Sequence, residues 1–193
     1  TPGVLDVDEI SGDGGVAIGT TSDPAHPANV YRSDLTFASV QPITNQNAWL
    51  ADYAPGGAEV IQWKSSRDGM AIEGIVTKPV DFVSGRRYAF LLNPHGGPTG
   101  SSLLTFNAQE QVLAANGYVV LEPNFRGSTG RGEQFAAANR NDWGNGDYKD
   151  DMSGVDAVIA RGWADPARLG AFGWSYGGFM TFWIDTQTDR FKA

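Results

Sequence analysis

Residues 169–180 read LGAFGWSYGGFM, and they constrain the fold more than any other stretch of the chain. The apolar residues predict a strand over Leu169–Trp174 and a helix over Tyr176–Asp185, with a G-x-S-x-G motif between them. A strand that leads through a glycine-bounded serine directly into a helix is typical of a nucleophile elbow, which exposes the serine at the carboxyl end of the strand. The segment therefore favours an α/β fold with Ser175 as a catalytic nucleophile.

Two glycines make this turn possible. Gly173 and Gly177 lack the Cβ atoms that would collide where the strand and the helix approach each other. The backbone N–H of Tyr176 is then expected to face the developing oxyanion. The alternative is a glycine-rich turn with an incidental serine, because about 0.2 such motifs are expected by chance in a chain with this glycine content.

A second glycine motif follows another predicted strand. Tyr88–Asn93 is apolar, and His95-Gly96-Gly97-Pro98 comes after it. A glycine pair at this place can turn a backbone N–H toward the same oxyanion, and we expect Gly97 to be that donor. We expect His95 to brace the loop by hydrogen bonding, with a role as general base as the alternative. The competing interpretation of the motif is an ordinary turn that ends at a proline.

A third glycine-rich loop, NFRGSTGRG, covers residues 124–132. It contains neither G-x-x-x-x-G-K-[ST] nor G-x-G-x-x-G, so the sequence predicts no nucleotide cofactor. Arg126 is expected to pair with a carboxylate and to brace the active-site loops. A solvated loop arginine is the equally consistent alternative.

The chain divides into two parts of different pattern. Residues 1–57 contain short strands separated by turn signals, which is typical of a β-sheet, but they are too few to close a propeller or a sandwich alone. From residue 58 onward, strands alternate with helices around a largely parallel sheet. The predicted strands are 4–10, 16–21, 29–33, 60–64, 70–77, 88–93, 118–122 and 169–174, with a loop at 22–27, and the predicted helices are 107–116, 147–161 and 176–185.

Composition excludes several classes of function. The chain has no cysteine and only two histidines without zinc-site spacing, so we expect neither a disulfide nor a metal centre. Its formal net charge of −8 repels phosphate backbones, and no apolar run is long enough to cross a membrane. We therefore expect neither nucleic acid nor membrane as a partner. The compartment stays open, with the cytoplasm as a default.

Five separated motifs together resemble the prolyl oligopeptidase family of serine peptidases, within it the acylaminoacyl-peptidase and bacterial dipeptidyl-peptidase-like branch. They are Trp63–Gly69, His95–Pro98, Asn124–Gly130, Asp165–Leu169 and Gly173–Gly178. The resemblance implies that residues 1–57 are the last strands of a β-propeller and that residues 58–193 are the first half of an α/β-hydrolase domain. It also implies cleavage of short or N-acylated peptides, with Ser175 as nucleophile and the amides of Tyr176 and Gly97 as the oxyanion hole. Trp174 departs from the smaller residue often found before the serine, and it is expected to line or narrow the pocket.

The serine has no evident catalytic partners in the sequence. In this fold the triad acid and histidine follow the serine in the chain. Asp185 and Asp189 lie on or beyond a helix that leads away from the elbow, and His26 lies in the β-rich part. We therefore expect the triad Asp and His in the remainder of the same protein, as a separate chain or as a part outside this sequence. We expect residues 1–193 alone to be inactive, because a serine without a base is a poor nucleophile.

Two other functions remain open. One is a carboxylesterase of the same fold, and the other is a catalytically incompetent binding or scaffold module. The expected partners are an oligopeptide substrate and the rest of the protein, with a homo-oligomer as a further possibility.

Overall fold

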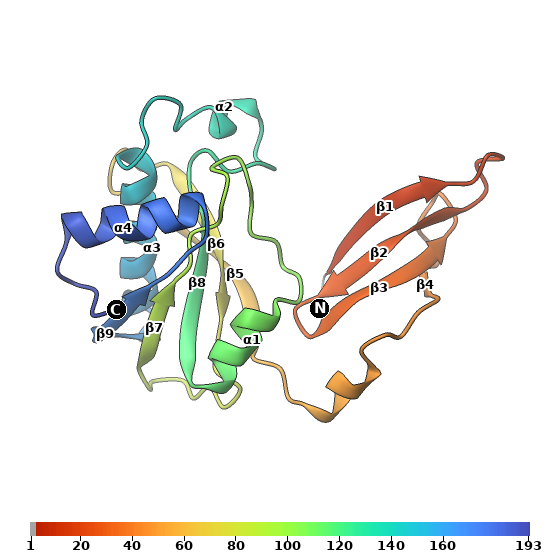
Figure 1. Cartoon of the computed structure of the whole chain (residues 1–193), viewed down its shortest axis with the longest axis horizontal. Coiled ribbons are helices and arrows are strands. Elements are labelled where there is room, and N and C mark those ends of the chain that lie inside the picture. Colours follow the sequence, from red (N-terminus) through yellow and green to blue (C-terminus); the bar gives the residue numbers. More distant parts are fainter. Residues whose placement is uncertain (1–2) are drawn as a thin grey trace.

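The computed structural model describes residues 3–193, which form two separate sheets (Figure 1). The first sheet is antiparallel, with strand order β1-β2-β3-β4. Its strands are β1 (Val4–Ile10), β2 (Ala17–Asp23), β3 (His26–Ser33) and β4 (Gln41–Pro42), and a short 3-10 helix, η1 (Ala48–Asp52), follows them. The three strands predicted in this region correspond to β1, β2 and β3, whereas the short β4 was not predicted.

The predicted loop at 22–27 is wrong in its length. β2 extends to Asp23 and β3 begins at His26, so only Pro24 and Ala25 connect the two strands. The carboxylate of Asp23 explains the tight turn, because it accepts hydrogen bonds from the backbone N–H groups of Ala25 (2.8 Å) and His26 (2.9 Å). These side-chain contacts let two strands meet where the prolines suggested a longer loop.

The second sheet has strand order β5-β6-β8-β7-β9, in which β7, β8 and β9 run parallel. Three longer helices connect or follow its strands, as predicted for an α/β arrangement. The strands are β5 (Ala58–Lys64), β6 (Ala71–Thr77), β7 (Tyr88–Leu92), β8 (Tyr118–Asn124) and β9 (Ala164–Ala171), and the helices are α1 (Ala108–Ala115), α2 (Glu133–Ala136), α3 (Gly146–Ala160) and α4 (Tyr176–Gln187).

The last strand differs from the prediction at both of its ends. A strand was predicted over 169–174, whereas β9 begins at Ala164 and ends at Ala171. Its pairing with β7 is irregular between Tyr88 and Phe90, which lets the strand pass Pro166 at the edge of the sheet. Trp174 consequently belongs to the turn and not to the strand.

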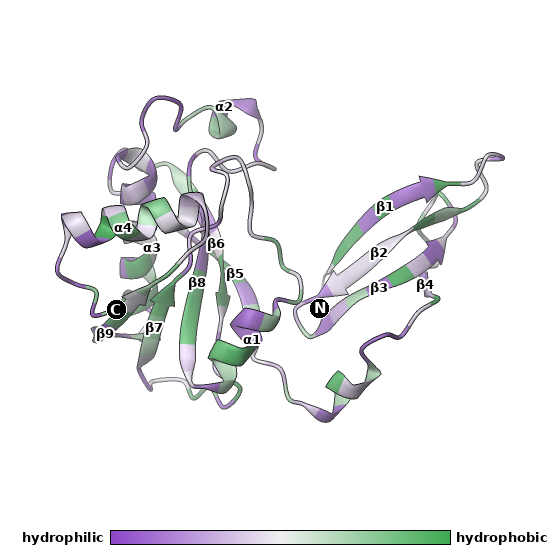
Figure 2. Ribbon diagram, viewed as in Figure 1, coloured by the Kyte–Doolittle hydropathy of each residue, from purple (hydrophilic) through white to green (hydrophobic). Residues whose placement is uncertain are grey.

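The hydrophobic core lies in the second sheet and its helices. Hydrophobic residues are concentrated in the central strands β7 and β8 (Figure 2), where Phe90, Leu92, Val119 and Leu121 are fully buried. α3 packs against β5, β6, β8 and β9. Trp63 links the two layers, since its indole N–H donates to the carbonyl oxygen of Asp150 in α3 (2.9 Å). This core holds the carboxyl ends of β7, β8 and β9 side by side, and the three predicted functional loops leave from those ends.

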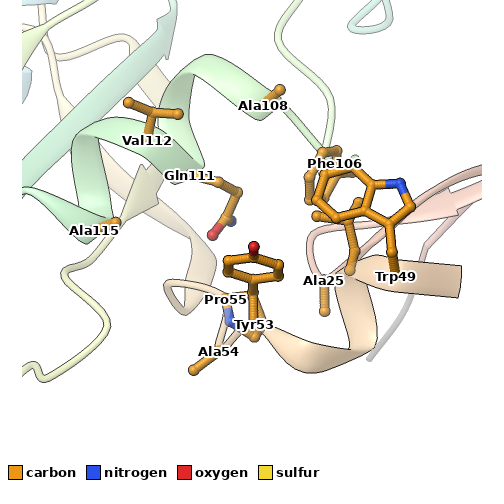
Figure 3. Close-up of a pocket in the computed structure, with 11 residues that line it drawn as sticks. Ala25, Trp49, Tyr53, Ala54, Pro55, Phe106, Ala108, Gln111, Val112 and Ala115 are labelled. Atoms are coloured by element: carbon orange, nitrogen blue, oxygen red, sulfur yellow. The ribbon is translucent and has the colours of Figure 1, made fainter. Parts of the chain in front are cut away.

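Gln111 of α1 joins the two parts of the chain. Its Oε1 accepts a hydrogen bond from the Gly56 N–H (2.7 Å), and its Nε2 donates to the carbonyl oxygen of Pro24 (3.3 Å) in the first sheet. Gln111 also lines a cavity of about 290 Å³, together with the side chains of Trp49 and Tyr53 (Figure 3). No predicted site residue lines this cavity, so we assign the chemistry elsewhere.

Candidate active site

Ser175 lies at a strained turn between β9 and α4. Its φ of 58° and ψ of −118° are rare for a residue with a side chain, and such a conformation costs about 1–3 kcal/mol. The turn is closed by a hydrogen bond from the Gly177 N–H to the carbonyl oxygen of Trp174 (2.9 Å). Ser175 is exposed to solvent, while Tyr176 directly after it is buried. This geometry is that of a nucleophile elbow.

Steric crowding explains both glycines of the motif. A Cβ atom on Gly177 would overlap the carbonyl oxygen of Pro94 and lie 3.0 Å from its carbonyl carbon. A Cβ atom on Gly173 would lie 2.5 Å from the carbonyl carbon of Gly177. Real Cβ atoms essentially never approach backbone atoms so closely. Gly177 therefore lets α4 begin directly against the loop that carries His95.

The glycine pair after β7 lies against the nucleophile. A Cβ atom on Gly96 would lie 3.4 Å from the Ser175 Cβ and 4.0 Å from its Oγ. Gly97 has a φ of 133°, which only glycine adopts readily, and a Cβ atom there would lie 2.5 Å from the Thr99 N. The role of Gly97 as an oxyanion donor stays a prediction. The sequence analysis gave Gly96 no role of its own, although the pair Gly96-Gly97 indicated that the backbone passes close to another group here.

His95 is engaged through both ring nitrogens. Its Nδ1 is 2.8 Å from the carbonyl oxygen of Gly96, and its Nε2 is 2.8 Å from the Ser128 Oγ. The ring also stacks on Phe125, with 4.4 Å between the ring centroids, and burial lowers the pKa of the imidazole. Because neither nitrogen is free to accept the proton of Ser175, the geometry favours bracing of the loop over general-base catalysis.

Arg126 is buried and paired, and it is not a solvated loop arginine. Its Nε and Nη2 donate to the two oxygens of Asp150 (2.8 Å each), and its Nη1 and Nη2 donate to Asp68 (2.8 and 3.0 Å). These hydrogen bonds lower the pKa of Asp68 to about 2. Arg126 thereby ties the loop after β8 to α3 and to the turn between β5 and β6. Its partners lie 24 and 58 residues away, so spacing gave no signal for them.

Aromatic side chains surround the elbow. The ring of Tyr176 packs against Phe125, Trp143 and Phe179, with centroid distances of 5.8, 5.2 and 5.2 Å. Trp174 is 87% exposed and Phe182 is 79% exposed. The Tyr176 side chain is buried, whereas Trp174, the residue before Ser175, exposes an apolar surface.

The side chains predicted as possible catalytic partners are engaged elsewhere or lie on other segments within residues 3–193. Among residues 3–193, no hydrogen bond joins the Ser175 Oγ to a histidine. His26 lies at the start of β3, where its Nδ1 pairs with Asp23 at 2.9 Å. Asp185 lies near the end of α4, and Asp189 follows that helix. The expectation that the triad acid and histidine lie outside these residues stays a prediction.

Within residues 3–193, no group of three or more His, Cys, Asp or Glu side chains could hold a metal ion. No helix in that range is both long enough and apolar enough to cross a membrane.

Glu110 and Glu122 are two carboxyl groups with raised pKa values on the elements next to β7. Asn93, directly after β7, donates its side-chain N–H to the Glu110 Oε1 (2.8 Å), and Glu110 is fully buried on α1. Burial raises the pKa of Glu110 to about 6. Burial and the nearby Glu110 charge raise the pKa of Glu122 on β8 to about 8. The folded protein therefore holds protons that the unfolded chain releases near pH 4.5.

This difference predicts a pH-dependent stability. Both pKa values are higher in the folded protein than the value of 4.5 in the unfolded chain. The two groups therefore contribute most to stability below pH 4.5, and this contribution is lost as the pH rises through their folded pKa values of about 6 and about 8. We expect the free energy of unfolding to fall by about 5 kcal/mol between pH 5 and pH 8, and Glu122→Gln to remove most of this fall. Urea unfolding at a series of pH values measures it. Glu133→Gln at an exposed position is the control, and an equally steep fall in Glu122→Gln would contradict the assignment.

The sequence and the structure both have known relatives. Residues 104–193 match the model of the prolyl oligopeptidase family. The chain is 39% identical to an uncharacterized peptidase of Bacillus subtilis over 91% of its own length and 27% of that protein. It is 31% identical to a dipeptidyl-peptidase 5 of Porphyromonas gingivalis, over 86% of this chain and 25% of that protein. The chain thus spans about a quarter of the length of these relatives.

The fold is also similar to solved structures. The acylaminoacyl peptidase of Pyrococcus horikoshii superimposes with a TM-score of 0.83 at 28% sequence identity, covering 98% of this chain and 29% of that one. An acylaminoacyl peptidase in complex with the chloromethyl ketone of Z-Gly-Gly-Phe gives the same TM-score at 29% identity, covering 98% of this chain and 29% of that one.

Proposed function

This chain belongs to the prolyl oligopeptidase family, and from that premise we propose that the protein containing it is a serine peptidase that hydrolyses short or N-acylated peptides. The observation that carries the proposal is the exposed Ser175 at a strained positive φ between β9 and α4. A serine is held in this conformation only where the surrounding structure enforces it, and such strain is concentrated at active sites. The names of the relatives, acylaminoacyl peptidase and dipeptidyl-peptidase, support short peptides as substrates.

The proposed reaction is acyl transfer in two steps. The Ser175 Oγ attacks the peptide carbonyl carbon while its proton passes to a histidine supplied by the rest of the protein. The negative charge on the carbonyl oxygen is stabilised by the backbone N–H groups of Tyr176 and Gly97. The amine then leaves with the transferred proton, and water hydrolyses the acyl-enzyme. The exposed Trp174 beside the serine is suited to contact an apolar part of the substrate.

We propose the same division of the chain that the sequence predicts. Residues 1–57 form the last strands of a β-propeller, and residues 58–193 form the first half of an α/β-hydrolase domain. The separate antiparallel sheet β1–β4 and the parallel arrangement of β7, β8 and β9 support this division. The 3-residue segment at 191–193 continues the second sheet, because the Lys192 N–H donates to the carbonyl oxygen of Leu169 beside it (2.8 Å). The rest of the protein is therefore proposed to extend this sheet beyond β9.

A fluorophosphonate probe tests the proposed function. We expect it to label the full-length protein at Ser175, as located by peptide mass spectrometry, and not to label Ser175→Ala. Residues 1–193 expressed alone should label far more slowly, because they lack a base for the serine. Labelling at another residue, or undiminished hydrolysis by Ser175→Ala, would refute the proposal.

The substrate class is tested separately. We expect the full-length protein to cleave N-acyl-peptide p-nitroanilides, whose amide bond is the less reactive one, as well as p-nitrophenyl esters of similar size. Hydrolysis of the esters alone would favour a carboxylesterase. Catalytic inactivity of the full-length protein on both classes would favour a binding module.

A further inference from the structure

We propose that Asp147 is a positioning residue of the oxyanion hole, acting through the side chain of Tyr176. The inference rests on the proposed function, since it assigns a role to a residue that supports the Tyr176 amide. Asp147 lies in the first turn of α3, far from the elbow in the sequence, and it is fully buried. Asp147 holds Tyr176, the residue after the nucleophile, in place through the hydroxyl at the far end of its side chain.

The first support is a direct hydrogen bond. The Tyr176 hydroxyl donates to the Asp147 Oδ2 across 29 residues of sequence. The other oxygen, Oδ1, accepts the backbone N–H of Tyr148 (2.8 Å), so both carboxylate oxygens are engaged. Because the side chain and the amide of Tyr176 belong to one residue, the hydroxyl contact restricts where the amide can lie.

The second support is the packing around the Tyr176 ring. Phe125 lies between Tyr176 and His95, at 5.8 Å from the first ring and 4.4 Å from the second. The loop that carries Gly97 and the elbow that carries Tyr176 are thus in contact with the same phenyl ring. Since two donors stabilise an oxyanion only at a defined separation, this shared contact sets the geometry of the hole.

The third support is a common anchor on α3. Phe125 precedes Arg126, whose Nε and backbone N–H both donate to the Asp150 Oδ2 (2.8 and 2.9 Å). Asp150 and Asp147 lie three residues apart on the same helix, so they share one face of it. The first turn of α3 therefore holds Tyr176 directly through Asp147 and holds the segment that carries Phe125 through Asp150.

The strain at Ser175 makes this restraint necessary. Ser175, at a φ of 58°, would relax to a more common backbone conformation if the residues next to it could move. Tyr176 is the next residue in the chain, so fixing Tyr176 helps to keep Ser175 in the strained conformation. Burial raises the pKa of Asp147, and the hydrogen bond from the Tyr176 hydroxyl opposes that effect. A buried carboxyl group at this position is thus stabilised by the same contact that holds the elbow.

Kinetics of the full-length protein with an N-acyl-peptide p-nitroanilide test the inference. We expect Tyr176→Phe and Asp147→Ala to lower kcat about 10-fold while KM changes less than about 2-fold, because the donor acts mainly on the transition state. Asp147→Asn keeps an oxygen acceptor for the hydroxyl and should recover most of the lost kcat. Fluorophosphonate labelling at Ser175 should slow in parallel. Tyr148→Phe, which removes the hydroxyl of a neighbouring core tyrosine, should leave kcat unchanged.

Two outcomes would overturn the inference. If Tyr176→Phe and Asp147→Ala retain the kcat of the wild type and lose only thermal stability, the contact is structural and has no positioning role. That result leaves the proposed function intact when Ser175→Ala is inactive. If Ser175→Ala still hydrolyses the substrate, the proposed function fails and the inference fails with it.

Discussion

Gly177→Ala is expected to lower kcat/KM of the full-length protein by at least about 100-fold. The new Cβ atom would overlap the Pro94 carbonyl oxygen, which belongs to the backbone and cannot rotate away. Either α4 or the loop that carries His95 and Gly97 must shift, and each carries one proposed oxyanion donor. Loss of a single such donor costs about 100- to 1000-fold in kcat, so a displaced donor is sufficient for the expected effect.

Gly178→Ala is the matched control in the same turn of α4. Its Cβ atom would lie 3.4 Å from the carbonyl oxygen of Gly173, which is ordinary contact. Alanine is favoured over glycine in a helix by up to about 1 kcal/mol, so we expect unchanged kinetics and equal or higher thermal stability. Steady-state kinetics and circular dichroism of both variants measure this. Similar activity of Gly177→Ala and Gly178→Ala would show that the close approach to Pro94 is not required.

Arg126→Met is expected to reduce the free energy of unfolding by about 3–5 kcal/mol. The Arg126 side chain is 4% exposed and the Asp150 side chain is fully buried, so the substitution leaves a buried carboxylate without its cation. It also removes the contacts to Asp68 that tie the turn between β5 and β6 to the loop after β8. Urea unfolding, followed by circular dichroism, measures the loss.

An exposed ion pair provides the control for that substitution. Arg168 pairs with Asp165 at 2.8 Å, and the two side chains are 55% and 29% exposed. We expect Arg168→Met to change the free energy of unfolding by less than about 1 kcal/mol, because water screens an exposed pair. The double variant Arg126→Met with Asp150→Leu should recover part of the stability, since it no longer buries an unpaired charge. Equal losses in Arg126→Met and Arg168→Met would contradict the account of the buried pair.

The elbow was predictable from sequence because its determinants are local. A tight turn depends on Gly173, Ser175 and Gly177, which lie within five residues of one another. The helix at 107–116 was predictable for the same reason. Its N-cap Asn107 accepts from the Gln109 N–H (3.0 Å), and Gly117 after it adopts a φ of 84°.

Local signals were insufficient where a distant strand decides the structure. β9 begins earlier than its own residues indicated, because Ala164 pairs with Tyr88 of β7, 76 residues before it in the chain. The partner of Arg126 could be named only as a carboxylate, since 22 acidic residues were candidates. Burial and helix position select Asp150 and Asp68 among them.

The sequence by itself determined that Ser175 lies in a glycine-bounded turn before a helix, where the other glycine-rich loops lie, and that the second part of the chain is α/β. These properties follow from backbone conformations that only neighbouring residues control. Only the tertiary structure decided that His95 is engaged through both ring nitrogens, that Phe125 contacts both proposed donor loops, and that Asp147 binds the Tyr176 hydroxyl. Apart from the bond between His95 and its neighbour Gly96, those contacts join residues 29 or more positions apart, which only the packing of the helices and loops on the sheet brings together, so no spacing in the chain could indicate them.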